Sequence, residues 1–163
     1  MVYGLKEISL FLFDLQNKPL NNKKRLHLHT SASRISYFQE SHTNMEMRIS
    51  RSLHNCMDII MYNLGYLPHG DKSITTLAST TLESFDQAYR LLRPLGWMSV
   101  LCYPGHPQGA IETQQVLTWI DNHQNHFELV EKSLGPTPSN LSPIFLLLRS
   151  RKTHSFVSDQ LIC

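Results

Sequence analysis

The chain has 163 residues, of which 41% are hydrophobic and 17% are charged, and its net charge is only +2. These values describe one compact globular domain and exclude a disordered tail, two ordinary domains and nucleic-acid binding through bulk charge alone. The three cysteines form no CxxC pair, and the sequence shows neither a membrane-length apolar run nor a signal-peptide pattern, which predicts a cytoplasmic protein that is not embedded in a membrane.

The first half of the sequence predicts three strands joined by polar segments. The apolar run 8–13 is rich in aromatic and branched residues, which indicates a strand buried on both faces, and it ends at Asp14. The next segment, 15–29, is polar with sparse leucines and predicts a short, mostly exposed helix. Further expected elements are a strand over 34–38, a helix over 45–53 and a strand over 57–62.

In the second half, amphipathic helices alternate with strands. Apolar residues recur at three- and four-residue steps over 82–92, which predicts a helix that Ser79 or Thr80 caps. Pro94 and Gly96 are expected to end that helix. The remaining predicted elements are a strand over 97–103, a helix over 110–123, and two closing strands over 127–134 and 144–149.

This order of elements predicts one mostly parallel α/β sheet with helices on both faces. The two closing strands have no helix between them, so they should pair as antiparallel neighbours. We expect a single domain over 1–152 and a polar tail over 153–163.

In such a sheet, ligands bind beyond the carboxyl ends of the strands. Asp14 is placed to accept hydrogen bonds from ribose hydroxyls, although strand-end aspartates also cap helices. The long loop 63–76 is either a polar crossover or a functional loop. Its amide, Asn63, could accept hydrogen bonds from an amino group, and a nearby aromatic ring could stack against the acceptor.

Histidines and basic clusters suggest less specific chemistry. His106 could take a proton in the loop after the fourth strand, or it could be structural. The histidine pairs at 27/29 and 123/126 lack partners at an established ligand spacing, so no metal site is predicted. Lys72 and the basic clusters at 23–25 and 149–152 are hypothesised to contact phosphates, although such clusters are commonly solvated ends of elements.

Two motifs resemble the signature loops of one family. They are Asn63-Leu-Gly-Tyr-Leu-Pro-x-Gly-Asp-Lys-Ser-Ile-x-Thr76 and Tyr103-Pro-Gly-His-x-x-Gly109. The family is that of the bacterial and plastid rRNA methylase-like (YtqB-like) proteins, which are class I S-adenosylmethionine-dependent methyltransferases. It is associated with methylation of the 5-aminomethyl group of 2-thiouridine at the tRNA wobble position. The likeness covers residues 8–150 and includes Phe13-Asp-Leu-Gln16, Gln39-Glu-Ser-His42 and Leu91–Gly96.

The resemblance implies a Rossmann-like class I methyltransferase sheet, S-adenosyl-L-methionine as the cofactor and tRNA as the partner, with a homodimer left open. The implied cofactor-binding residues are Asp14 at the ribose, with Gln16 nearby in the sequence, then Glu40, Ser41 and His42 at the adenine, and Asn63. The implied catalytic residues, beside the transferred methyl group and the acceptor amine, are Asn63, Leu64, Gly65 and Tyr66. The implied substrate-binding residues are Asp71, Lys72, Tyr103, Gly105 and His106.

The sequence departs from the family at its beginning. Members start with a strand and an acidic-x-Gly-x-Gly turn for the methionine end of the cofactor, whereas only thirteen residues precede Asp14 here and Gly4 is their sole glycine. In the family this first strand is central, so its absence would leave open strand edges on both sides of a gap. We therefore expect an incomplete domain that starts at an internal methionine or descends from a truncated gene.

Three classes of function remain open at this point. The first is an RNA methyltransferase, and the second is a catalytically impaired methyltransferase-like remnant that binds RNA or a partner protein. The third is an unrelated α/β nucleotide-binding protein such as a dehydrogenase, which would need a glycine-rich turn that this sequence also lacks.

Overall fold

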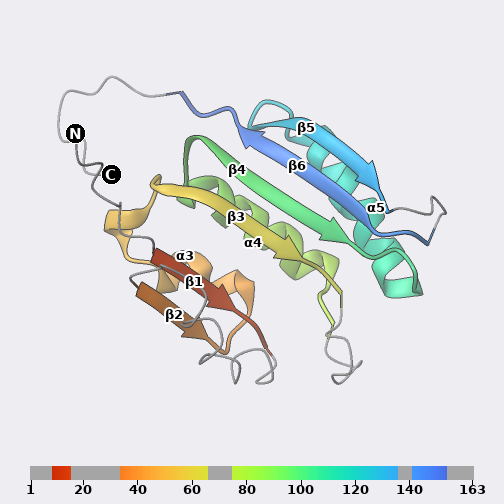
Figure 1. The fold of residues 1–163 in the computed structure, drawn as a ribbon, viewed down its shortest axis with the longest axis horizontal. Helices are drawn as coiled ribbons and strands as arrows, with labels where there is room; N and C mark the ends of the chain where they lie inside the picture. Colours follow the sequence, from red (N-terminus) through yellow and green to blue (C-terminus); the bar gives the residue numbers. More distant parts are fainter. Residues whose placement is uncertain (1–8, 16–33, 66–74, 136–140, 154–163) are drawn as a thin grey trace, which may run out of the picture.

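The chain folds into two β-sheets with helices packed beside them, in a computed structural model that describes residues 9–15, 34–65, 75–135 and 141–153 (Figure 1). The first part contains strands β1 (Ser9–Phe13) and β2 (Arg34–Phe38), the 3₁₀ helix η1 (His42–Asn44), helix α3 (Met45–Arg48) and the 3₁₀ helix η2 (Arg51–Leu53). The second part contains β3 (Met57–Asn63), α4 (Ala78–Leu91), β4 (Leu92–Cys102), α5 (Pro107–Asn122), β5 (Phe127–Leu134) and β6 (Ile144–Ser150).

The strands form a two-stranded sheet, β1-β2, and a four-stranded sheet in the order β3-β4-β6-β5. Parallel pairing joins β1 to β2 and β3 to β4, whereas β6 runs antiparallel to both of its neighbours. The predicted antiparallel closing pair is therefore confirmed. In both views β1 lies beside β3 and runs in the same direction, but the two strands share no ladder. Within the described residues, no strand occupies the position between them where the family's central strand was expected.

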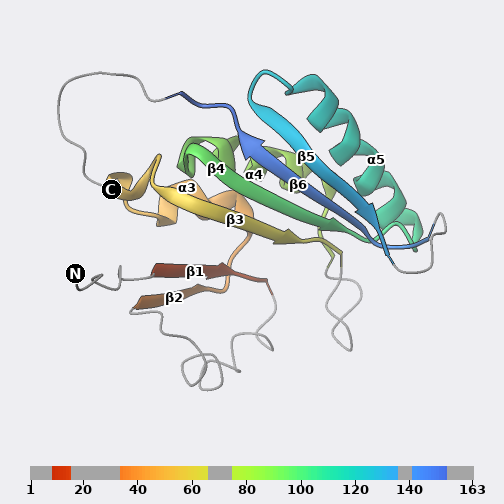
Figure 2. The same cartoon turned by 45° about the horizontal axis from the view of Figure 1, so that its top comes forward.

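Helices α4 and α5 cover one face of the four-stranded sheet (Figure 2). They contact each other through Phe85 and Trp119, whose ring centroids are 5.1 Å apart. The fully buried side chains of the sheet, which face these helices, include Met98, Val100, Leu146 and Leu148. On the opposite face no described helix covers β3, where Ile59 is 51% exposed and Met61 is 74% exposed. Coverage of both faces, as predicted, is thus not seen in the described part of the chain.

Two predictions about the first part of the chain are wrong. Residues of β1 are half-buried or exposed rather than buried on both faces, and among the described residues β1 has a strand partner on one edge only. The helix predicted over 45–53 is shorter, since Ile49 adopts extended dihedral angles that end α3 after one turn.

The α4–β4 connection also differs from the prediction. Helix α4 has Leu77 as its N-cap residue, and the Thr80 hydroxyl donates back to the Leu77 carbonyl instead of capping the helix. The helix ends at Leu91, before Pro94 and Gly96, and β4 begins at once with an irregular stretch. A Cβ atom on Gly96 would lie 3.0 Å from the Met57 carbonyl oxygen, so glycine allows β3 to approach closely there.

Candidate functional site

The C-terminal ends of β1, β2, β3 and β4 point to the same edge of the molecule (Figure 1). This edge carries four of the predicted site residues, Asp14, Glu40, Asn63 and Tyr103, one beyond or at the end of each strand. The backbone N–H of Asp14 donates to the Phe38 carbonyl at 3.1 Å, which fixes Asp14 at the end of the β1-β2 pair. The topology therefore brings the predicted cofactor and acceptor residues to one edge, as expected for a parallel sheet.

The ends of β3 and β4 are joined by a side-chain contact. The Tyr103 hydroxyl donates to Oδ1 of Asn63 at 3.0 Å, and the Asn63 side chain stays exposed to solvent. Leu64 is 4% exposed, so its side chain belongs to the core. Its backbone N–H donates to the Leu101 carbonyl and extends the pairing of β3 with β4 by one residue. Gly65 has a φ of +98°, which favours glycine, and a Cβ atom added there would lie 3.7 Å from the Tyr103 ring.

A buried carboxylate holds the end of the loop that follows β3. Glu112 of α5 is 2% exposed and accepts two hydrogen bonds of 2.7 Å, one from the hydroxyl of Thr76 and one from the hydroxyl of Thr81. The hydroxyl of Thr76 in turn accepts a 2.7 Å hydrogen bond from the Gly65 N–H. Burial and then the negative charge of Glu112 raise the pKa of the neighbouring Cys102 thiol to about 12.

The loop after β4 forms the start of α5. His106 is the N-cap residue, and its Nδ1 atom accepts a hydrogen bond from the Gly109 N–H at 3.1 Å. A Cβ atom on Gly109 would lie only 2.1 Å from the Tyr103 carbonyl oxygen, which explains the glycine of the Tyr-Pro-Gly-His-x-x-Gly motif. Gly105 is exposed and lies against the carbonyl of Leu141. The Nδ1 atom of His106 therefore has a structural role, as the alternative interpretation of this histidine held.

The residues predicted at the adenine make local contacts. Glu40 forms an ion pair with Arg48 and accepts a 3.0 Å hydrogen bond from Asn44, and its pKa is lowered chiefly by the Arg48 hydrogen bond. Ser41 caps η1 by accepting from the Thr43 N–H. His42 packs edge-on against Tyr62, and burial lowers the pKa of its imidazole.

Several predictions fall on undescribed segments. Gln16, Tyr66, Asp71 and Lys72 lie outside the described residues, as do the basic cluster 23–25 and the pair His27/His29. Within the second basic cluster, Arg149 pairs with Glu128, and Lys152 donates to the carbonyls of Arg90 and Leu92. Both side chains therefore make contacts within the protein, although neither is buried.

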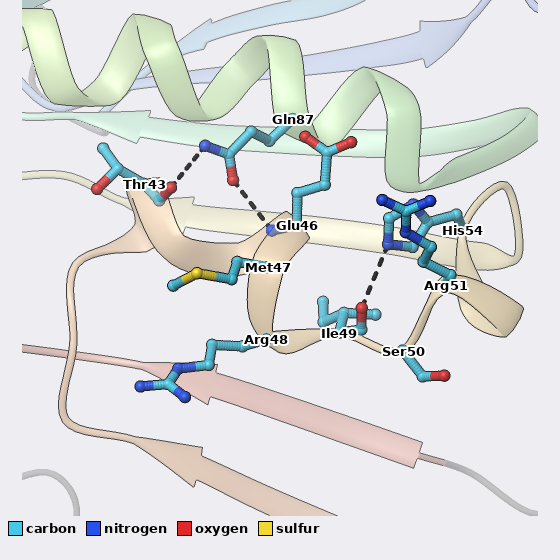
Figure 3. Close-up of a pocket in the computed structure, with 9 residues that line it drawn as sticks. All are labelled: Thr43, Glu46, Met47, Arg48, Ile49, Ser50, Arg51, His54 and Gln87. Carbon is cyan, nitrogen blue, oxygen red and sulfur yellow. Dashed lines mark hydrogen bonds between the residues drawn. The ribbon is translucent and has the colours of Figure 1, made fainter.

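A surface cavity of about 840 Å³ lies between η1, α3, η2 and Gln87 of α4 (Figure 3). The Gln87 amide bridges this region by donating to the Thr43 carbonyl and accepting from the Glu46 N–H. None of the predicted site residues that the structure describes lines the cavity. Its residues Arg51 and His54 precede β3, whereas Arg48, which also lines it, pairs with Glu40, one of the residues predicted at the adenine.

Sequence reasoning missed Glu112, Thr81 and Arg48. The signal for Glu112 was present, because it shares a helical face with Val116 and Trp119, which are both buried. A carboxylate on an apolar face needs hydrogen-bond donors, and Thr76 and Thr81 supply them.

The described residues contain no group of three or more His, Cys, Asp or Glu side chains that could hold a metal ion. They also contain no helix that is both long and apolar enough to cross a membrane.

In sequence, the chain is similar to known methylases. The model of the family described as "Putative rRNA methylase" matches residues 10–148. A chloroplastic tRNA (mnm(5)s(2)U34)-methyltransferase of Arabidopsis thaliana is 48% identical over 58 residues, which make up 36% of this chain and 21% of that protein. The chain thus matches about a fifth of the length of this curated relative.

Solved structures show the same likeness in the fold. One, described as a "putative rRNA-methylase" from Clostridium thermocellum, has a TM-score of 0.73 and 30% identity, with 86% of this chain and 74% of that chain covered. A "putative methyltransferase" from Streptococcus mutans, in complex with SAH, has a TM-score of 0.71 and 16% identity, with 89% of each chain covered. The predicted Rossmann-like class I methyltransferase fold is confirmed. Because the family model matches most of its 163 residues, the chain belongs to the family described as "Putative rRNA methylase".

Proposed function

We propose that this chain forms the acceptor side and part of the cofactor side of an S-adenosylmethionine-dependent RNA methyltransferase. Its proposed acceptor is the aminomethyl group of a tRNA wobble uridine, in keeping with the name of the Arabidopsis relative. The observation that carries the proposal is the hydrogen bond from Tyr103 to Asn63, which fixes an exposed amide at the C-terminal ends of two adjacent strands.

The described residues fit the ribose end of the cofactor. Asp14 stands at the end of β1 with its backbone anchored to β2, where a carboxylate can accept hydrogen bonds from ribose hydroxyls. No Gly-x-Gly sequence for the methionine end occurs among the 163 residues. When bound, S-adenosylmethionine supplies a methyl group on a sulfonium, which an amine nitrogen takes with release of S-adenosylhomocysteine.

The contribution of the chain itself is mainly orientation. The Asn63 Oδ1 atom has two lone pairs, of which Tyr103 uses one, so the other can accept a hydrogen bond from the acceptor amine. Holding the amine in this way directs its nitrogen lone pair toward the donor methyl group. Because Asn63 is exposed, the proton that the amine releases can pass directly to water.

The test combines binding with methyl transfer. Calorimetry would measure binding of S-adenosylhomocysteine to the folded chain, and radiolabelled S-adenosylmethionine would report transfer to tRNA that carries 5-aminomethyl-2-thiouridine. Asp14→Ala should abolish binding, whereas Asn63→Ala should keep binding and slow transfer by about 100-fold or more. Asn122→Ala, at an exposed position on the last turn of α5, is the matched control and should change neither.

Each failure has a separate meaning. A folded chain that binds S-adenosylhomocysteine but transfers no methyl group would support the alternative, a methyltransferase-like protein that binds without catalysis. A folded chain with no binding would contradict the cofactor assignment for these residues. Equal transfer by the wild type and Asn63→Ala would contradict the role of the amide.

A further inference from the structure

Glu112 is a buried charge that the proposed reaction does not use. It is 2% exposed, and no salt bridge among the described residues includes it. Both carboxylate oxygens act as acceptors, one from Thr76 and one from Thr81. Burying a carboxylate in a protein core costs free energy unless its hydrogen bonds are well made. If position 112 served packing alone, an apolar side chain would be more stable there.

The contacts of Thr76 connect this carboxylate to the candidate acceptor site. Its hydroxyl donates to Glu112 and accepts from the N–H of Gly65, each at 2.7 Å, and its backbone N–H donates to the Gly65 carbonyl at 3.3 Å. Residues 65 and 76 are the two ends of the loop that follows Asn63. These three hydrogen bonds therefore close the loop at its base and tie the base to α5.

The same base is tied to the neighbouring loop and to α4. The hydroxyl of Tyr103, in the loop after β4, donates to Oδ1 of Asn63, two residues before Gly65. Thr81, the other partner of Glu112, lies in the first turn of α4. One carboxylate thus sets the relative position of the end of β3, the start of α4 and α5.

We propose that Glu112 is a positioning residue, which acts through Thr76 to hold Asn63 and Gly65 in place for the acceptor amine. This inference rests on the proposed methyltransferase function. It requires no contact between Glu112 and the substrate or cofactor. Misplacement of Asn63 by about 1 Å is enough to slow a reaction that depends on alignment by about 100-fold.

The chain offers a matched set of variants. Thr76→Val removes the hydroxyl that joins Glu112 to Gly65, and Thr76→Ser restores that hydroxyl. Thr81→Val removes the other donor to the same carboxylate but leaves the Gly65 contact intact. Glu112→Gln keeps the side-chain shape, but its amide group offers only one acceptor oxygen to the two hydroxyls.

The rate of amide hydrogen exchange at Gly65 reports on the hydrogen bond from Gly65 to Thr76, and it can be measured without any enzymatic activity. Under conditions of local opening, Thr76→Val and Glu112→Gln should speed Gly65 exchange by about tenfold or more, and Thr76→Ser should restore it. Thr81→Val should lower the melting temperature while leaving Gly65 exchange within about threefold of the wild type. An unchanged Gly65 rate in Thr76→Val, or an equal rise in Thr81→Val, would overturn the proposal.

Methyl transfer then separates positioning from general stability. If the wild-type chain transfers methyl groups, Glu112→Gln should lower its kcat by about 10- to 100-fold with little change in the Kd for S-adenosylhomocysteine. A loss of cofactor affinity with unchanged kcat would overturn the positioning role. If the wild type itself transfers no methyl group, the proposed function fails, while the exchange measurement still decides whether Glu112 holds the loop.

Discussion

The four-stranded sheet and the β1-β2 pair are built very differently. In the four-stranded sheet, side chains such as Met98, Val100 and Leu146 are completely buried beneath α4 and α5. In β1 no residue is fully buried, and the ring of Phe13 stacks on that of Phe38 in β2, with the ring centroids 4.6 Å apart. The proposed acceptor residues Asn63 and Tyr103 lie at the strand ends of the first region, whereas Asp14 lies at the end of β1 in the second.

This difference assigns different physical tasks to the two regions. The acceptor loops rest on a dense core and are held by buried hydrogen bonds, so they are prepared before any ligand arrives. Asp14, the proposed ribose ligand, follows two strands in which no described side chain is fully buried, and such regions open with a low free energy. Cofactor binding should therefore stabilise the β1-β2 pair more than the acceptor loops.

The largest expected effect comes from truncating the core. Phe85→Ala removes a ring that is 0% exposed and touches both Tyr62 and Trp119, so it should cost about 3–5 kcal/mol in the free energy of unfolding. Phe11→Ala is the matched change in β1, where the ring is half-buried, and it should cost less than about half of that. Urea denaturation of both variants checks the comparison, and equal losses would mean that β1 is as much a part of the core as α4.

Ligand-induced protection gives the next effect in size. Saturation with S-adenosylhomocysteine at about 100 times its Kd should stabilise whatever region must fold to bind it by about 2.7 kcal/mol. Hydrogen exchange should show this protection at the amides of β1 and β2, including the Asp14 N–H that donates to Phe38. Protection confined to β3 and β4 would show that the β1-β2 pair plays no part in binding.

The sequence predicts the four-stranded region better than the first region, and the reason is physical. Strands at 57–63 and 144–150 and the helices around 78–91 and 107–122 have strong periodicity that matches the burial they reach. The run 8–13 has an equally strong apolar pattern, but its burial depends on a second strand partner that no described residue supplies. Apolar composition indicates what a strand can bury, and the pairing decides what it does bury.

The candidate site shows a similar division. Placement of Asp14, Asn63 and Tyr103 at one edge follows from the parallel topology and could be predicted. The Glu112–Thr76–Gly65 chain of hydrogen bonds could not be, because it joins residues 65, 76 and 112 through a packing of α5 that sequence spacing does not encode. For His106 the sequence left a proton-accepting and a structural role open, and it did not indicate that the histidine caps α5.

Substitution of Gly109 by alanine tests how tightly the turn between β4 and α5 is packed. Gly109→Ala would place a Cβ atom 2.1 Å from the Tyr103 carbonyl oxygen, so the turn between β4 and α5 must shift, at a cost of about 1–3 kcal/mol. Gly135→Ala is the control, since its Cβ atom would have an ordinary 3.4 Å contact with Pro143. Thermal unfolding monitored by circular dichroism would compare them, and a tolerated Gly109→Ala would argue against a rigid acceptor side.

The smallest effect concerns the segment that links the two regions. Arg90 of α4 forms an ion pair with Glu46 of α3, and this hydrogen bond is the main reason that the pKa of Glu46 lies below its usual value of 4.5. A carboxyl group with a lowered folded-state pKa contributes stability above pH 4.5, and this stability is lost as the pH falls through the folded-state pKa. Because both side chains are partly exposed, Glu46→Gln should cost at most about 1 kcal/mol at pH 7. The difference in stability from the wild type should disappear in acid.

Asp58→Asn is the control for this ion pair. Asp58 is 81% exposed in its pair with Arg93, so the stability lost in Asp58→Asn should be smaller still. A Glu46→Gln deficit that persists at low pH would mean that packing, rather than charge, holds α3 on α4.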